Sequence, residues 1–106
     1  MSALLPIGFL GAGKMACALA RGFMRAGLAT PDQIMASDLL EGAREVFAKE
    51  VHAPTSSANA EVVRYARVVL LAVKPDQVPG VLEEVRPYFT DQHLLISIAA
   101  GVTPSR

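Results

Sequence analysis

The feature that most limits how this 106-residue chain can fold is a short apolar run followed by two closely spaced glycines. The run ends at Leu10, and Gly11–Gly13 follows it in the spacing G-x-G-x-x-A that closes at Ala16. A helical pattern begins at Lys14. A strand, a glycine turn and a helix in this order form the fingerprint of a site that binds the pyrophosphate of a dinucleotide.

The small residues of this turn have separate mechanical roles. Gly11 lets the chain turn sharply off the strand, and Gly13 has no Cβ atom, so a phosphate can approach its backbone. Ala16 lets the helix lie close to the strand. The free N–H groups and the positive dipole end of the helix then face the phosphates. An ordinary tight connection between a strand and a helix is the alternative interpretation.

Apolar runs alternate with amphipathic stretches along the rest of the chain. Strands are expected at Leu4–Leu10, Ile34–Ser37, Val51–Ala53, Val68–Val73 and Leu94–Ala100, with helices between them. The fourth run is continuous and rich in β-branched residues, which is typical of a central strand buried on both faces. This alternation predicts an α/β, Rossmann-like, doubly wound fold with a mostly parallel sheet in the order 3-2-1-4-5. We expect residues 1–106 to form one dinucleotide-binding domain.

Apolar spacing also predicts the faces and ends of the helices. Gly27 is expected to end the first helix in a left-handed conformation. Ala43, Val46 and Phe47 share one face of the helix after the second strand. The helix that starts near Pro75 has its own apolar stripe, made of Val78, Val81, Leu82, Val85 and Phe89.

Polar residues follow the second strand, at the edge of the sheet where open α/β folds bind ligands. Ser37-Asp38 ends this strand, and an acidic residue there accepts hydrogen bonds from the adenosine ribose hydroxyls in dinucleotide-binding folds. Asp38 equally fits a cap for the next helix. Asn59 fits a helix N-cap or a contact to the adenosine half of a cofactor.

The fourth and fifth strands end at the same expected edge. Lys74, directly after the fourth strand, would meet an anion of the cofactor or substrate, or is a solvated loop lysine. The small residues at 99–101 would let a flat ring approach the backbone, or they are ordinary turn residues. Together with the glycine turn, these clusters predict an extended dinucleotide site.

Charge and hydropathy exclude several classes of function. Ten Lys and Arg balance ten Asp and Glu, so no basic excess points to a nucleic-acid partner. The longest apolar runs are too short to span a bilayer, and no charged segment of a secretory signal precedes them. Neither the P-loop pattern of ATP hydrolysis nor the G-x-S-x-G elbow is present.

The single cysteine and the two histidines carry little chemistry. Cys17 excludes an internal disulfide and suits a reducing cytoplasm, where we expect the protein to act. It is either a small buried residue or, near the helix start, an acidified thiol. His52 and His93 lack metal-ligand spacing, so we expect turn or surface histidines and no metal site.

Four segments, in order and at matching spacing, carry a resemblance to a known family. They are Ile7–Ala16, Ile34–Ser37, Leu71–Pro75 and Ser97–Thr103, and they resemble Δ1-pyrroline-5-carboxylate reductase through essentially all 106 residues. The A-V-K-P and S-x-A-A-G-V-T sequences are more specific than the glycine turn. The resemblance implies reduction of pyrroline-5-carboxylate to L-proline by hydride from NADPH or NADH, the last step of proline biosynthesis.

The resemblance also implies which residues contact the cofactor. The pyrophosphate would lie on the glycine turn, the adenosine at the end of the second strand, and the nicotinamide half at the ends of the fourth and fifth strands. The residues implied are Leu10, Gly11, Ala12, Gly13, Lys14, Met15, Ser37, Asp38, Asn59, Ala72, Val73, Lys74, Pro75, Ile98, Ala99 and Ala100.

Asp38 departs from what NADPH requires. Its carboxylate stands where the 2′-phosphate of NADPH would lie and would repel that phosphate, although Arg44 could compensate. NADPH and NADH are therefore both open as cofactors at this stage.

Length is the second departure. The family has a helical C-terminal domain that forms the dimer and completes the substrate pocket. Thr103-Pro104 predicts the start of a further helix just before the chain ends. We therefore expect an excised N-terminal domain, inactive alone and without catalytic residues, whose parent is a homo-oligomer.

Two other classes share this fold. One is a different β-hydroxyacid or amino-acid dehydrogenase, against which the A-V-K-P and A-A-G-V-T segments argue. The other is a non-catalytic NAD-sensing module, which needs an attached effector domain that 106 residues do not show.

Overall fold

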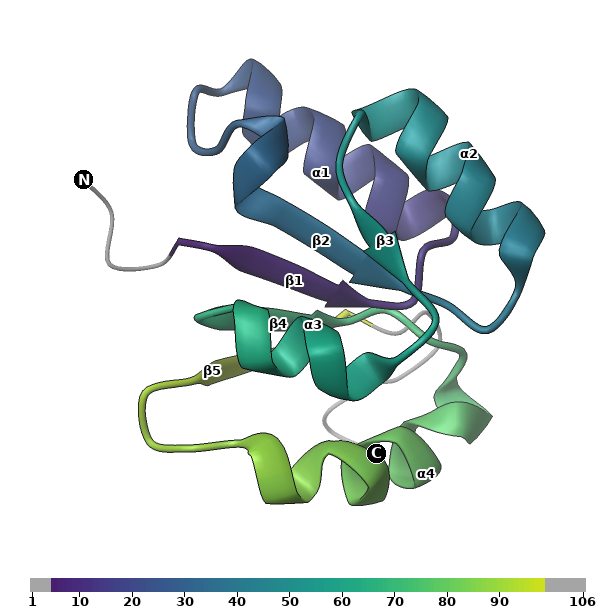
Figure 1. Cartoon of the computed structure of the whole chain (residues 1–106), viewed down its shortest axis with the longest axis vertical. Coiled ribbons are helices and arrows are strands. Elements are labelled where there is room, and N and C mark those ends of the chain that lie inside the picture. The colour runs from purple at the N-terminus through teal and green to yellow at the C-terminus, as the bar shows by residue number, and fades with distance from the viewer. Residues whose placement is uncertain (1–4, 99–106) are drawn as a thin grey trace.

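Five short parallel strands form one sheet in the order β3-β2-β1-β4-β5, in a computed structural model that describes residues 5–98 (Figure 1). The strands are β1 (Ile7–Leu10), β2 (Ile34–Ser37), β3 (Thr55–Ser56), β4 (Val68–Leu71) and β5 (Leu94–Ser97). The helices are α1 (Lys14–Arg25), α2 (Glu41–Val51), α3 (Asn59–Tyr65) and α4 (Val78–Val85), with 3-10 turns at Pro31–Gln33, Pro75–Gln77 and Arg86–Tyr88. The predicted fold class and strand order are confirmed.

Two helices cover each face of the sheet. Figure 1 shows α1 and α2 on one side and α3 and α4 on the other. Adjacent residues of a strand pack into opposite cores. Phe9 and Leu70 belong to the cluster under α1 and α2, whereas Leu10 and Leu71 belong to the cluster under α3 and α4. Side chains alternate along a strand, so a continuous apolar run is what a strand between two helix layers requires.

Phe9 joins the central strand to both helices of its layer. Its side chain is fully buried, and its ring centroid lies 6.3 Å from that of Phe23 on α1 and 6.0 Å from that of Phe47 on α2. These separations are within the range of favourable aromatic pairs. The contact between Phe9 and Phe23 therefore fixes α1 against β1 through the buried face of the helix.

The carboxyl ends of the strands line up at one edge of the sheet. Leu10 pairs with Ser37 of β2 and with Leu71 of β4, and Leu71 pairs with Ser97 of β5. All these pairings are parallel. Loops that leave the strands at this row therefore start side by side, as the sequence predicted.

The predicted third strand at Val51–Ala53 is wrong. Val51 is the last residue of α2 and is buried one turn after Phe47. His52 ends the helix with φ 64°, and the strand forms later, at Thr55–Ser56. Val51 completes the apolar stripe of the helix, and this i, i+4 spacing outweighs its β propensity.

Other boundaries differ by less. Strands one, four and five are shorter than the apolar runs that predicted them, and residues 99–106 lie outside the described part of the chain. Val46 is 54% exposed and does not join the core with Ala43 and Phe47. Gly27 has φ 76° at the end of α1, as predicted.

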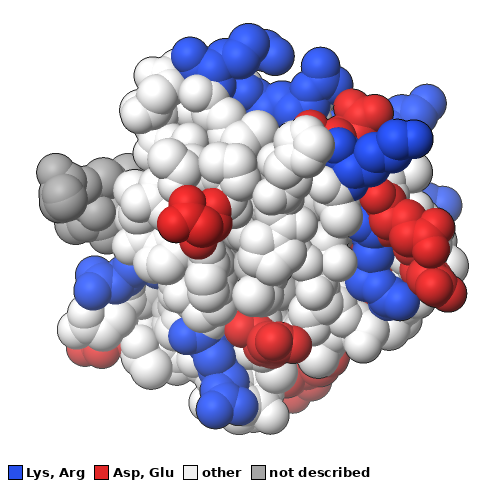
Figure 2. Space-filling view, turned by 45° about the horizontal axis from the view of Figure 1, so that its top comes forward, with Lys and Arg blue, Asp and Glu red and all other residues white. Residues whose placement is uncertain are grey.

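The surface differs between strands and between faces. Leu94, Leu95 and Ile96 of β5 are exposed, whereas every residue of β1 and β4 is buried. On the face shown in Figure 2, groups of both charges surround a largely uncharged area. None of the helices within residues 5–98 has the length and apolar character needed to cross a membrane.

Gly8 permits the close approach of α3 to β1. A Cβ atom at this position would lie 2.5 Å from Cγ1 of Val62 and 2.9 Å from Cβ of Ala66. We expect Gly8→Ala to lower the free energy of unfolding by about 2 kcal/mol, because α3 must move away from the sheet. Urea unfolding measures this change.

Gly22 in α1 provides the matched control. A Cβ there meets no atom within 4 Å, so Gly22→Ala is expected to raise the free energy of unfolding by about 0.5–1 kcal/mol. Wild-type stability of Gly8→Ala would contradict the close packing of α3 on β1.

Candidate functional site

The glycine turn is held between the ends of two neighbouring strands. Gly11 N donates to Ser37 O at 2.8 Å, and Ala72 N donates to Leu10 O at 2.8 Å. Gly11 has φ 109°, and a Cβ atom on it would lie 2.8 Å from Ala72 O. Position 11 therefore requires glycine for both its backbone conformation and its close contact with the β4 end.

Gly13 leaves the start of α1 open. It is the N-cap of the helix, and a Cβ added to it would meet no atom within 4 Å. Glycine has no side chain that could accept hydrogen bonds from the first turn, so it does not cap the N–H groups of the following residues. An uncapped helix start with free space above it suits the pyrophosphate of a dinucleotide.

Asp38 ties the end of β2 to the glycine turn and to α2. Its Oδ2 accepts a hydrogen bond from Ala12 N at 2.9 Å, and its Oδ1 accepts one from Leu40 N at 3.0 Å. Nη1 of Arg44 donates to the Asp38 carbonyl at 2.9 Å. Asp38 is not the N-cap of α2, so that interpretation of the sequence is wrong, because Leu40 occupies the position. The carboxylate keeps lone pairs that a ribose hydroxyl can use.

Asn59 connects β2 with α4 and is not an N-cap. Ala58 occupies that position, and Asn59 is the first residue of α3. Ser37 Oγ donates to Asn59 Oδ1 at 2.5 Å, while Asn59 Nδ2 donates to Glu84 Oε1 at 3.0 Å. The N-cap prediction is wrong because the side chain has long-range partners that replace the local backbone group.

These elements surround one pocket of about 630 Å³ at the strand ends, here called the strand-end pocket. Its volume is that of a typical site for a small molecule or cofactor. The predicted site residues that line it are Gly11, Gly13, Ser37, Asp38, Asn59, Ala72, Val73 and Lys74. The structure therefore brings residues from three separate strand ends to one place.

Several predicted site residues lie elsewhere. Leu10 is fully buried beneath the turn, Met15 is exposed on α1, and Ile98 packs against the core under α1 and α2. Pro75 begins the 3-10 turn before α4. Ala12 and Lys14 line a second groove, and Ala99 and Ala100 lie outside the described residues.

Sequence reasoning missed one wall and one rim of the strand-end pocket. The residues missed are Leu39, Leu40, Ala43, Gln77, Gly80, Val81 and Glu84. Leu39 and Leu40 are 84% and 69% exposed, and two consecutive leucines outside any apolar stripe could have marked the rim. The α4 residues carried no such indication, because only the tertiary fold packs this helix beside α3 at the edge of the pocket.

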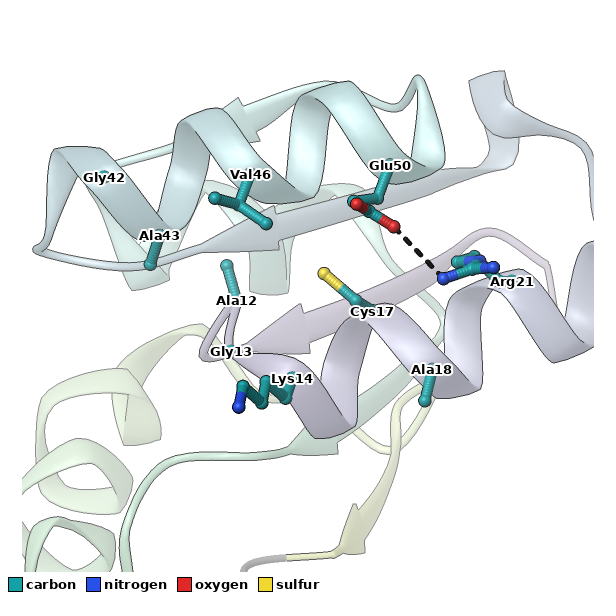
Figure 3. A pocket seen from close by; sticks show the side chains of 10 residues that line it. All are labelled: Ala12, Gly13, Lys14, Cys17, Ala18, Arg21, Gly42, Ala43, Val46 and Glu50. Carbon is teal, nitrogen blue, oxygen red and sulfur yellow. Dashed lines mark hydrogen bonds and ion pairs between the residues drawn. The ribbon is translucent and has the colours of Figure 1, made fainter.

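A second groove of about 600 Å³ lies between α1 and α2 (Figure 3). The sulfur of Cys17 points toward α2 between Val46 and Glu50, and Lys14 points away from α2. The pair Arg21 Nη1–Glu50 Oε1, 3.1 Å apart, links the two helices at one end. This interhelical groove meets the glycine turn at Ala12 and Gly13, and within residues 5–98 it contacts no other strand end.

Cys17 is a buried thiol and not an acidified one. Its side chain is only 8% exposed. Burial raises the pKa of the Cys17 thiol, nearby Glu50 raises it further, and Arg21 opposes the shift. The expectation of a small buried residue is confirmed, and the alternative of a reactive thiolate at the helix start is wrong.

The pKa direction predicts slow thiol chemistry. Raising the pKa keeps Cys17 protonated at pH 7, so a disulfide reagent should react at least about tenfold more slowly with the folded chain than with the chain in denaturant. The rate should keep rising with pH beyond the ordinary thiol value of about 8.5. Stopped-flow absorbance measures it, with Cys17→Ser as the blank. A plateau below pH 8 would contradict the burial argument.

The histidines have structural positions. His93 lies in the turn before β5, where Thr90 N donates to its Nδ1 at 3.0 Å and its Nε2 lies 2.8 Å from Val63 O. His52 ends α2. Within residues 5–98, no three His, Cys, Asp or Glu side chains gather as metal ligands would.

Comparison with known proteins places this site in a family. Residues 6–101 match the family described as NADP oxidoreductase, coenzyme F420-dependent. The chain belongs to this family. Its sequence is 43% identical over 96 residues to the pyrroline-5-carboxylate reductase of Methanosarcina acetivorans, which covers 91% of this chain and 36% of that protein.

Two solved structures of pyrroline-5-carboxylate reductases superpose on the chain. A pyrroline-5-carboxylate reductase from Coxiella burnetii superposes with a TM-score of 0.84 at 32% identity, over 94% of this chain and 37% of the other. The Plasmodium falciparum pyrroline carboxylate reductase, with NADP bound, gives a TM-score of 0.78 at 29% identity, over 96% and 36%. The predicted resemblance to the N-terminal NAD(P)-binding domain of these reductases is confirmed, and the chain spans little more than a third of their length.

Proposed function

We propose that this chain is the cofactor-binding domain of an NAD(P)H-dependent Δ1-pyrroline-5-carboxylate reductase, which forms L-proline. The observation that carries the proposal is the meeting of the glycine turn, the β2 end and the β4 end around the strand-end pocket. The family match and the likeness to pyrroline-5-carboxylate reductases supply the substrate class.

Different residues of this chain are assigned to different parts of the cofactor. Gly13 and the first N–H groups of α1 receive the pyrophosphate. Asp38 and Asn59 lie where the adenosine ribose is bound in this fold. Ala72–Pro75, which follow β4, lie toward the nicotinamide half, and residues 98–100 are assigned to the same half.

A nicotinamide held there would supply the hydride for the carbon of the substrate C=N bond. The chain's own contribution is orientation, because the pocket fixes where the nicotinamide end emerges. We place the groups that bind the imine and protonate its nitrogen, and the contacts of a homo-oligomer, in the part of the relatives that this chain does not match. The chain alone is expected to bind the cofactor without turning over.

Nucleotide binding tests the first half of the proposal. Calorimetric titration should show that the chain binds NADPH or NADH. Gly13→Val should weaken binding at least about tenfold, because its side chain fills the space of the pyrophosphate, while the free energy of unfolding changes by less than about 1 kcal/mol.

The matched control is Gly22→Ala in α1, which lies outside both the pocket and the groove and should bind as wild type does. Wild-type affinity of Gly13→Val would contradict the assignment of the pyrophosphate. The reaction itself is tested with the full-length gene product, pyrroline-5-carboxylate and each nucleotide. Absence of proline formation with both nucleotides would refute the substrate.

A further inference from the structure

The carboxamide of Asn59 is held from both ends. Ser37, which is fully buried, donates its hydroxyl proton to Oδ1, and Glu84 of α4 accepts a proton of Nδ2. Oδ1 therefore faces β2 and Nδ2 faces α4. One N–H and one lone pair of the carboxamide stay available to a ligand in the strand-end pocket.

Among the residues that the structure describes, two carboxylates line the strand-end pocket, Asp38 and Glu84, and their surroundings differ. Asp38 accepts two backbone N–H groups, and Arg44 binds the carbonyl of the same residue. These donors offset the negative charge at the end of β2.

Glu84 has a neutral partner. Its hydrogen bond comes from the Asn59 carboxamide, and the ion pairs within residues 5–98 are Arg21–Glu50 and Arg86–Glu83, so neither includes it. Of these two carboxylates, the less compensated one therefore lies on α4, facing the end of β2 across Asn59.

We propose that Glu84 is a specificity-determining residue, which disfavours a phosphate on the 2′-oxygen of the adenosine ribose and so favours NADH over NADPH. This inference rests on the proposed function, because that function places the ribose at Asp38 and Asn59. A ribose hydroxyl can both donate to and accept from the carboxamide, whereas a phosphate at neutral pH accepts only. The phosphate also carries up to two negative charges, which the Glu84 carboxylate repels.

Two isosteric substitutions on one helix separate this effect from the general field of the protein. Glu84→Gln removes the charge but keeps an oxygen that accepts from Asn59. Glu83→Gln removes the same charge one residue away, where the carboxylate pairs with Arg86 at 2.8 Å and does not line the pocket. Both side chains are exposed, so both variants are expected to fold, and thermal melting verifies this.

The readout is the ratio of the dissociation constants for NADPH and NADH, measured by calorimetry at low salt. In Glu84→Gln this ratio should fall about fivefold, with little change for NADH, and in Glu83→Gln it should stay within about twofold of wild type. The effect of Glu84→Gln on the ratio should shrink in high salt, because counterions screen the interaction between exposed charges.

Two results would overturn the inference. They are an unchanged ratio in Glu84→Gln, whether or not both affinities change together, and an equal fall of the ratio in Glu83→Gln. If the wild-type chain bound both nucleotides with either of these results, only the role of Glu84 would fail. If it bound neither nucleotide, the proposed function would fail as well.

Discussion

The structure depends on how the glycine turn is fastened to its neighbours. Gly11 donates to the end of β2, Leu10 accepts from Ala72 after β4, and Ala12 donates to the Asp38 carboxylate. These bonds bring the starts of three loops together. Without them the start of α1 would be released from the ends of β2 and β4, although Phe9 still packs against the helix, and the open N–H groups of its first turn would no longer be held at the pocket.

Burial of β1 on both faces of the sheet supports the glycine turn that follows it. The two cores place neighbouring residues of β1 on opposite sides, so Phe9 holds α1 and α2 while Leu10 packs toward α3 and α4. The turn leaves the strand directly after Leu10. Its geometry is therefore set by a rigid element, which is what precise placement of a ligand requires.

The polar residues of the site also hold the fold. Asp38 binds the glycine turn and the start of α2, and the chain of hydrogen bonds from Ser37 through Asn59 to Glu84 crosses from the sheet to α4. A group used in this way has fewer free lone pairs and protons for a ligand, so its charge environment matters as much as its identity. This is why Asp38 and Glu84, both carboxylates, differ in what they offer to a nucleotide.

The sequence by itself determined the features that contiguous residues encode. The glycine turn, the doubly buried β4 run and the alternation of strands with helices predicted the fold and strand order, because spacing and apolar period act locally. Tertiary structure decided the rest. Asn59 took partners 22 and 25 residues away, Cys17 lost its exposure between two helices, and Glu84 entered the pocket only because α4 packs beside α3, whose Asn59 bonds to the end of β2. Contacts between distant segments leave no periodic trace in the chain, so no local pattern could have revealed them.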